Sequence, residues 1–308
     1  MEQAPIPKSG RGTGFAGPQA ASPLTQERGE DAQRRRGVSM PLRHFLLALQ
    51  FFTRIPVTGR LADWVGFSPA MLRASAAHFP GVGWVVGGLT AVVFYGLLML
   101  LPAQSAAPWV AAVACTVFSV LLTGAFHEDG LADTADGLGG SPSRERALEI
   151  MKDSRIGSYG AVALVLAFLS KVALLALLAQ AGGTLLATAG LFAAHVSSRL
   201  MPLFIIRTLP HVGDTPTSKS KPLAESIGNA GLATGLLWWA LAMALVGWAL
   251  PGAPWPQAVL GALLGLAWMW RLLRRRLQGF TGDGLGATQQ VSELGFYLGL
   301  ALCLPATP

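Results

Sequence analysis

The residues best suited to chemistry lie in one short segment, FHEDGLADTADGLGG at 126–140, which carries three regularly spaced aspartates. Asp129, Asp133 and Asp136 follow one another at intervals of four and three residues. At about 100° per residue, this spacing confines them to an arc of about 60° on a helix. All three carboxylates are therefore expected to face the same way.

Such an arrangement predicts a metal site. Like charges at this spacing destabilise an isolated helix by a few tenths of a kcal/mol per pair, so a bound cation is expected to offset their repulsion. Mg²⁺ takes oxygen ligands and is usually held by one or two carboxylates together with substrate phosphates. A solvated acidic surface is the alternative, but the segment directly follows an apolar stretch and is interleaved with glycines, which favours the site. His127, off this arc, is a further catalytic candidate.

A second segment, MKDSRIGSYG at 151–160, combines Lys152 and Arg155 with serines and glycines. Arginine offers a bidentate fork to phosphate and lysine a point charge, while glycine lets backbone N–H groups approach an anion. The segment therefore predicts a phosphate-binding site. Ordinary positive charge beside a membrane span is the alternative, and it accounts for the two cations but not for the glycines.

Asp283 lies between two glycines in GFTGDGLGATQQVSE at 279–293, just ahead of another apolar stretch. Gly-Asp-Gly is also a sequence that favours a turn, so Asp283 alone is weak evidence for a metal site. Beside the aspartates of 126–140 it would supply one more oxygen ligand. We therefore count Asp283 among the predicted metal ligands.

Four more basic residues are predicted to contact the substrate. Lys171 and Arg199 fall inside apolar stretches, where ionisable groups are costly unless paired and are functional candidates by default. A salt bridge that only holds the bundle together is the alternative for both. Arg73, before HFPGVGWVVGG, and Lys221, in SKSKP, are candidates for anion contacts, with surface anchoring as their alternative.

The composition places these residues in a membrane. Apolar residues make up 52% of the 308-residue chain and charged residues only 13%, which is too little charge to solvate a globule of this length. The net charge of +7 comes largely from arginines within 34–36 and 271–276. Because these runs flank apolar spans, anchoring at the membrane surface explains them better than nucleic-acid binding.

The predicted fold is all-α, a polytopic membrane bundle of about seven transmembrane helices. A bilayer needs about 20 apolar residues per helix, and the stretches that meet this are 82–101, 109–126, 159–181, 184–206, 231–250, 256–273 and 288–304. Charged and uncharged loops alternate between them. The positive-inside rule then places the charged loops, and the site, on the cytoplasmic side of the inner membrane, with the C-terminus outside.

Two N-terminal segments lie outside these spans. Residues 1–40 mix Gly, Pro, Arg and Gln without a long apolar run, which predicts a disordered tail and no secretory signal. Residues 43–56, RHFLLALQFFTRIP, are too short and too charged to span, which favours an interfacial or re-entrant helix. The remainder, 41–308, is expected to form a single membrane-embedded catalytic domain.

Several motifs together resemble the cobalamin synthase family of membrane-bound adenosylcobinamide-GDP ribazoletransferases. They are FFTRIP at 51–56, HFPGVGWVVG at 78–87, FHEDGLADTADG from 126, MKDSRIGSYG from 151, the Ser-Arg pair at 198–199 and TGDGLGA at 281–287. They recur in family order over nearly all the chain outside the tail. The chain departs from the pattern at Glu128, where the family usually has an apolar residue, and at Gly284.

The resemblance implies a Mg²⁺-dependent phosphotransferase of cobalamin biosynthesis. A ribose hydroxyl of α-ribazole, or of its 5′-phosphate, would attack the corrinoid-proximal phosphorus of adenosylcobinamide-GDP and release GMP. Asp129, Asp133, Asp136 and Asp283 would hold the metal, and Lys152 and Arg155 would offset charge on the leaving phosphate. The general base is open between an aspartate of the cluster and His127. Association with other enzymes of the pathway is also left open.

Two alternatives remain at this stage. A CDP-alcohol phosphatidyltransferase also uses clustered aspartates and Mg²⁺, but Asp129-Gly130 is followed by Leu-Ala-Asp instead of that family's Ala-Arg. A secondary transporter is suggested by Lys171, His195 and Arg199 within spans. Transport sites lie near the midplane on broken helices, whereas most charges here lie at one end of the spans.

Overall fold

The computed structural model describes residues 40–212 and 226–304. The predicted tail at 1–40 and Lys221 therefore lie, apart from residue 40 itself, outside the described residues. Leu42–Pro308 forms one compact unit. Within the described ranges the structure is helical, with one isolated bridge between His211 and Phe280 and no strand. The predicted all-α class is confirmed.

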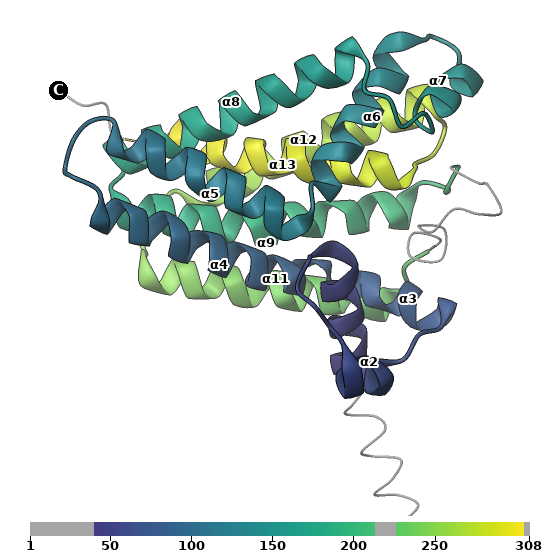
Figure 1. The fold of residues 1–308 in the computed structure, drawn as a ribbon, viewed down its shortest axis with the longest axis horizontal. Helices are drawn as coiled ribbons and strands as arrows, with labels where there is room; N and C mark the ends of the chain where they lie inside the picture. The colour runs from purple at the N-terminus through teal and green to yellow at the C-terminus, as the bar shows by residue number, and fades with distance from the viewer. Residues whose placement is uncertain (1–39, 213–225, 305–308) are drawn as a thin grey trace, which may run out of the picture. The chain divides into compact units, whose positions relative to one another are not determined.

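Each stretch predicted to span the membrane is helical over most of its length (Figure 1). The long helices are α4 (Phe79–Leu100), α5 (Ala107–Thr123), α8 (Ser158–Ala181), α9 (Thr184–Thr208), α11 (Asn229–Ala249), α12 (Trp255–Arg276) and α13 (Gly282–Ala301). The acidic segment forms α6 (Phe126–Gly140). Shorter helices cover 40–52, α2 (Gly59–Val65), α3 (Pro69–Ser75), η1 (Ala76–His78) and α7 (Arg144–Ile150).

Fewer of these helices are apolar enough to cross a membrane than the seven expected. Five qualify by length and composition, namely the run Pro69–Leu100 together with α8, α9, α11 and α12, and the bent pair of α5 and α6 adds a sixth if it is one span. Helix α13 lies beside α12 (Figure 1) but does not qualify. Its polar side chains Gln289, Gln290 and Glu293 lower its hydropathy, and all three are buried in the bundle.

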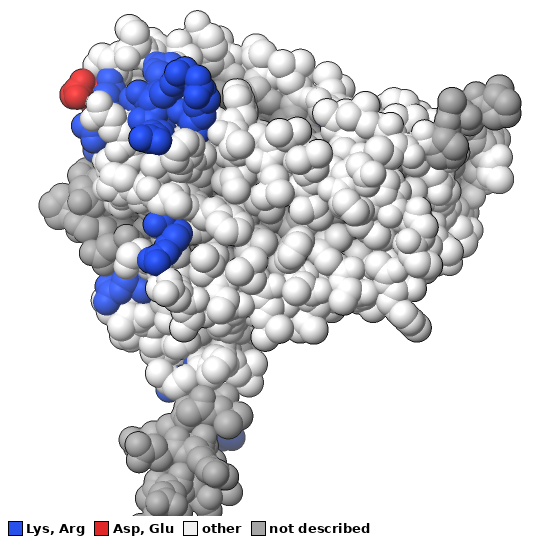
Figure 2. Space-filling view, turned by 180° about the vertical axis from the view of Figure 1, so that it is seen from behind, with Lys and Arg blue, Asp and Glu red and all other residues white. Residues whose placement is uncertain are grey.

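Helix α9 forms the centre of the bundle. Of its most apolar window 83% is buried, against 17% for α11 and 28% for α8. The outer helices instead expose large apolar side chains such as Leu100, Leu166 and Trp248. Figure 2 shows one face that is almost free of charge except at one end, where Lys and Arg gather. This distribution is the one expected of a multi-pass membrane protein.

A tight turn sets the direction of α6. Gly124 and Ala125 both have left-handed backbone conformations, with φ of 65° and 59°, and α6 leaves α5 at 90°. The FFTRIP segment packs against this turn, since the Arg54 N–H donates to the Leu122 carbonyl at 2.7 Å and the Arg54 side chain contacts Gly124. The acidic helix is therefore directed by a junction between two motifs far apart in sequence.

We expect Gly124→Ala to lower the melting temperature of the detergent-purified protein by roughly 2–8 °C, because an L-residue in this conformation costs about 1–2 kcal/mol. The added methyl would also displace the Arg54 side chain. Gly88→Ala is the matched control, since Gly88 lies inside α4 with open space around its Cβ position. Equal melting temperatures for the two variants would contradict this account of the turn.

Candidate active site

The three aspartates of α6 share one helix, as predicted, but differ in environment. Asp129 is exposed, Asp133 is half-buried and Asp136 is buried. The carboxylates of Asp129 and Asp136 both lie close enough to Asp133 to repel a negative charge on its side chain. The helix therefore carries its acidic residues from the surface into the protein.

Asp136 ties α6 to the start of α8. One carboxylate oxygen accepts the Gly157 N–H at 2.7 Å and the other accepts the Gly160 N–H at 2.8 Å. A Cβ at either glycine would overlap the carboxylate. The glycines predicted to approach a substrate phosphate thus bind a carboxylate of the protein instead, which corrects that part of the phosphate-site prediction. Each oxygen retains a further lone pair, so metal binding by Asp136 stays a prediction.

Asp283 lies beside the acidic helix, at the start of α13. A Cβ on Gly130 of α6 would lie 2.8 Å from the Asp283 carbonyl oxygen, so the two backbones are in close contact there. The Thr281 hydroxyl caps α13 by accepting the Gly284 N–H at 3.1 Å. Burial and the nearby Asp129 charge raise the pKa of Asp283 to about 6. The two acidic segments predicted to cooperate are therefore together.

The side chains at the contact between α6 and α13 offer the type of ligand atom that a hard cation prefers. Every side chain offered by Asp129, Asp133 and Asp283 is an oxygen donor, and their like charges lie close together. Among the described residues, however, no three His, Cys, Asp or Glu side chains are close enough to hold a metal ion by themselves. Substrate phosphates usually supply some of the ligands of Mg²⁺. This arrangement therefore suits a metal ion that binds together with a diphosphate.

Lys152 and Arg155 lie in the short connection between α7 and α8 and both are exposed. Arg155 forms a salt bridge of 2.6 Å with Asp153 while 87% of its side chain remains accessible. Hydrogen bonds from Arg155 lower the pKa of Asp153 to about 2. Exposed ion pairs of this kind contribute little stability, so the guanidinium can exchange its partner for a phosphate.

The basic residue in the middle of α8 has an internal partner. The Lys171 ammonium lies 2.7 Å from Glu293 of α13, and both side chains are almost fully buried. Gln289 and Tyr297 donate to the same carboxylate at 2.7 and 3.0 Å. The salt bridge that was the alternative to substrate binding by Lys171 is therefore present.

Sequence reasoning missed Glu293 as that partner. The available signal was a carboxylate inside the predicted span 288–304, where a buried charge needs a counterion. Glu128 is likewise buried and accepts a hydrogen bond from Gln290 at 3.0 Å. Both residues give α13 polar contacts inside the bundle.

Arg199 of α9 is buried next to this network. One of its terminal nitrogens donates to the His195 carbonyl at 3.0 Å and lies 3.0 Å from that residue's ring nitrogen Nδ1. His195 in turn lies 3.7 Å from Glu293. Of the basic residues that suggested a transporter, Lys171 and His195 thus lie beside one carboxylate, and Arg199 contacts His195.

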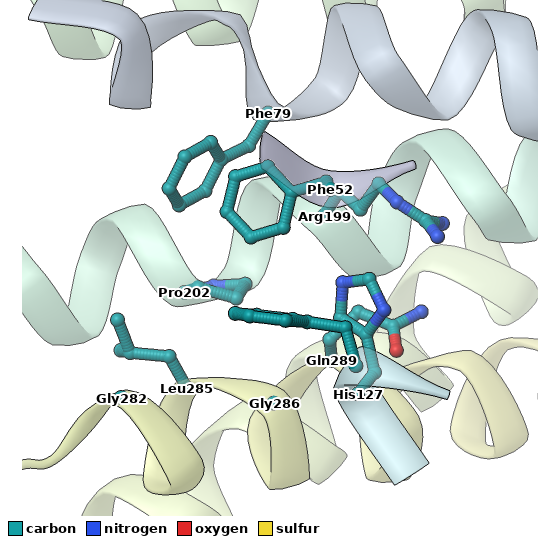
Figure 3. A pocket seen from close by; sticks show the side chains of 10 residues that line it. Phe52, Phe79, His127, Arg199, Pro202, Gly282, Leu285, Gly286 and Gln289 are labelled. Atoms are coloured by element: carbon teal, nitrogen blue, oxygen red, sulfur yellow. The ribbon is translucent and has the colours of Figure 1, made fainter. Parts of the chain in front are cut away.

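Arg199 and His127 also line an apolar pocket between α6, α9, α13 and the FFTRIP segment (Figure 3). The three phenylalanines Phe52, Phe79 and Phe126 form much of its wall. Of the sequence-predicted site residues, the structure therefore brings His127 and Arg199 to one cavity beside the acidic residues.

Two predicted substrate contacts are not placed at this site. Arg73 lies in the last turn of α3, half-buried. Lys221 falls within 213–225, which the structure does not describe. Their roles in substrate binding stay predictions.

Comparison with known proteins identifies the family. The model of the cobalamin-5-phosphate synthase family matches residues 44–301. The chain belongs to this family. The match begins within the helix at 40–52 and ends with α13, so it covers every helix of the candidate site. The resemblance seen in the motifs is confirmed.

Curated relatives agree with this family. The adenosylcobinamide-GDP ribazoletransferase of Albidiferax ferrireducens is 60% identical over 87% of this chain and all of its own length. That of Polaromonas naphthalenivorans is 58% identical over 85% of this chain and 99% of its own, and that of Leptothrix cholodnii 48% over 83% and 94%. No solved structure matches the chain.

A double-mutant cycle tests the buried pair of this family member. We expect Lys171→Met and Glu293→Gln each to cost about 3–5 kcal/mol, because each leaves one buried charge uncompensated, and the double variant to cost clearly less than their sum. Unfolding of the purified protein in mixed micelles provides the measurement. Glu149→Gln, which breaks only the exposed Arg146–Glu149 pair on α7, is the control and should cost at most about 1 kcal/mol. Additive single effects would show that the pair is not coupled.

Proposed function

We propose that this chain is a membrane-bound, Mg²⁺-dependent phosphotransferase that joins adenosylcobinamide-GDP to α-ribazole, or its 5′-phosphate, and releases GMP. The relatives carry the name adenosylcobinamide-GDP ribazoletransferase, and the family model carries that of cobalamin-5-phosphate synthase. The observation that carries the proposal is the meeting of Asp129 and Asp133 with Asp283 beside an apolar pocket.

The reaction forms one phosphorus–oxygen bond and breaks another. The ribose hydroxyl oxygen bonds to the phosphorus on the corrinoid side of the diphosphate, and the bond from that phosphorus to the bridging oxygen breaks. GMP leaves with the bridging oxygen, and the hydroxyl proton passes to a base. Phosphoryl transfer of this kind needs mostly positioning and charge neutralisation, so no covalent enzyme intermediate is required.

The residues divide this work between them. Asp129, Asp133 and Asp283 would hold Mg²⁺, which when bound offsets negative charge on the diphosphate. Lys152 and Arg155 reach the leaving phosphate from the connection between α7 and α8. The proton acceptor is an aspartate of α6 or His127, and Asp136 positions α6 against α8.

We also place this site at the cytoplasmic side of the inner membrane. The arginines that end α12 and those of α7 meet at one end of the bundle, where Arg144 donates to the Leu277 carbonyl at 2.7 Å and Arg276 donates to the Ser141 carbonyl at 2.5 Å. Arginine-rich ends of this kind face the cytoplasm by the positive-inside rule. Both substrates would then reach the site from the cytoplasm or along the membrane surface.

Substitution of the acidic residues tests the metal site. We expect Asp129→Asn, Asp133→Asn and Asp283→Asn each to reduce GMP release from adenosylcobinamide-GDP and ribazole by about a hundredfold or more, because charge neutralisation is lost. Asp63→Asn, on the exposed side of α2, is the matched control. Chelation should abolish release and Mg²⁺ restore it, and Mn²⁺ binding followed by electron paramagnetic resonance should weaken in the same three variants. Full activity in chelator would refute the metal.

Arginine geometry tests the phosphate contact. We expect Arg155→Lys to raise the KM for adenosylcobinamide-GDP by about tenfold, because a bidentate charge-assisted contact becomes a single one. Arg146→Lys, another exposed arginine in an ion pair, should leave that KM unchanged. An unaltered KM in the Arg155 variant would remove this residue from the substrate site.

A further inference from the structure

The pocket has an aromatic wall and one polar end. Phe52 lies edge to face against Phe79, with ring centroids 4.6 Å apart, and against Phe126 at 5.2 Å. Its ring is stacked on His127 at 5.9 Å. Figure 3 shows His127, Gln289 and Arg199 towards one end of the cavity, and Leu285 at the other.

This pocket adjoins the acidic residues through the backbone of two helices. His127 precedes Asp129 by two positions, and the lining residues Gly282 and Gly286 flank Asp283. A Cβ on Gly286 would lie 3.3 Å from the His127 carbonyl oxygen, so α6 and α13 touch at the pocket. A molecule bound here would therefore lie at the contact between α6 and α13, the two helices that carry Asp129 and Asp283.

The residues that line the pocket suit some parts of the two proposed substrates better than others. The corrin ring carries many amide groups that need polar partners, and a wall made largely of phenylalanines offers few of them. Guanine needs several hydrogen bonds along one edge, yet both ends of the Gln289 amide are already engaged, with Ser198, Glu293 and Gln290. A methylated benzimidazole is flat, largely apolar and needs few polar partners.

We infer that this pocket binds the aromatic base of ribazole and thereby delivers the ribose hydroxyl to the acidic residues. Edge-to-face contacts with the phenylalanines suit a flat heteroaromatic ring. Arg199 Nε is buried and has no hydrogen-bond partner among the described residues, so a donor is available near the polar end. This inference rests on the proposed function and adds to it the place where the acceptor substrate is recognised.

Competition by the free base tests the inference in the wild-type protein. Free 5,6-dimethylbenzimidazole should inhibit GMP release competitively with respect to ribazole and not with respect to adenosylcobinamide-GDP. Competition with adenosylcobinamide-GDP, or no inhibition up to the solubility limit of the base, would overturn the assignment. Absence of GMP release from the uninhibited wild type would instead refute the proposed function, so the two failures are distinguishable.

Paired variants provide a second, independent measurement. Phe52→Leu and Phe79→Leu should raise the KM for ribazole about three- to tenfold through loss of aromatic contact, while the KM for adenosylcobinamide-GDP changes less than about twofold. Phe94→Leu, at a fully buried phenylalanine of α4 that does not line the pocket, is the control for general damage to the core. Equilibrium dialysis of labelled ribazole should show the same loss of affinity without turnover. An increase confined to the other substrate, or unchanged binding of ribazole, would refute the inference.

Discussion

The buried carboxylate of Glu293 fixes the position of α13, and with it much of the site. A charge inside a membrane bundle is costly unless it is paired, and Lys171 of α8 meets it at 2.7 Å. The same helix begins beside Asp283 and carries Gln289 into the pocket wall. A rotation of α13 that separated the pair would also move the acidic residue and the pocket. Charge pairing in the core therefore affects the geometry of the acidic residues and of the pocket.

Helix α6 is held at three places along its length. The left-handed residues Gly124 and Ala125 set its direction, Gly130 brings it against α13, and Asp136 binds the first turn of α8. Between the first and the last of these places, Asp129 is exposed and Asp133 is half-buried. Aspartates on a helix fixed in this way need little rearrangement before a substrate binds.

Much of this could be predicted from composition and spacing. The bilayer requires long apolar helices, so all seven stretches were recognisable, and the spacing of three aspartates placed them on one helix. The partners of Lys171 and Asp136 could not be predicted, because Glu293 and Gly160 are distant in sequence and chosen by packing. The seventh predicted span, 288–304, could not be judged from sequence for the same reason. Its polar residues are explained by their burial in the bundle, which only the structure shows.

The pair of Arg155 with Asp153 has a consequence for binding in salt. Under the proposed function, a diphosphate must replace a carboxylate that already occupies the guanidinium. Dissolved ions weaken the resident pair and the incoming contact together, since both are exposed and subject to the same screening. The two effects partly cancel, so the affinity for the nucleotide substrate should depend only weakly on ionic strength. Under that proposal, the enzyme would tolerate changes in salt concentration at this exposed contact.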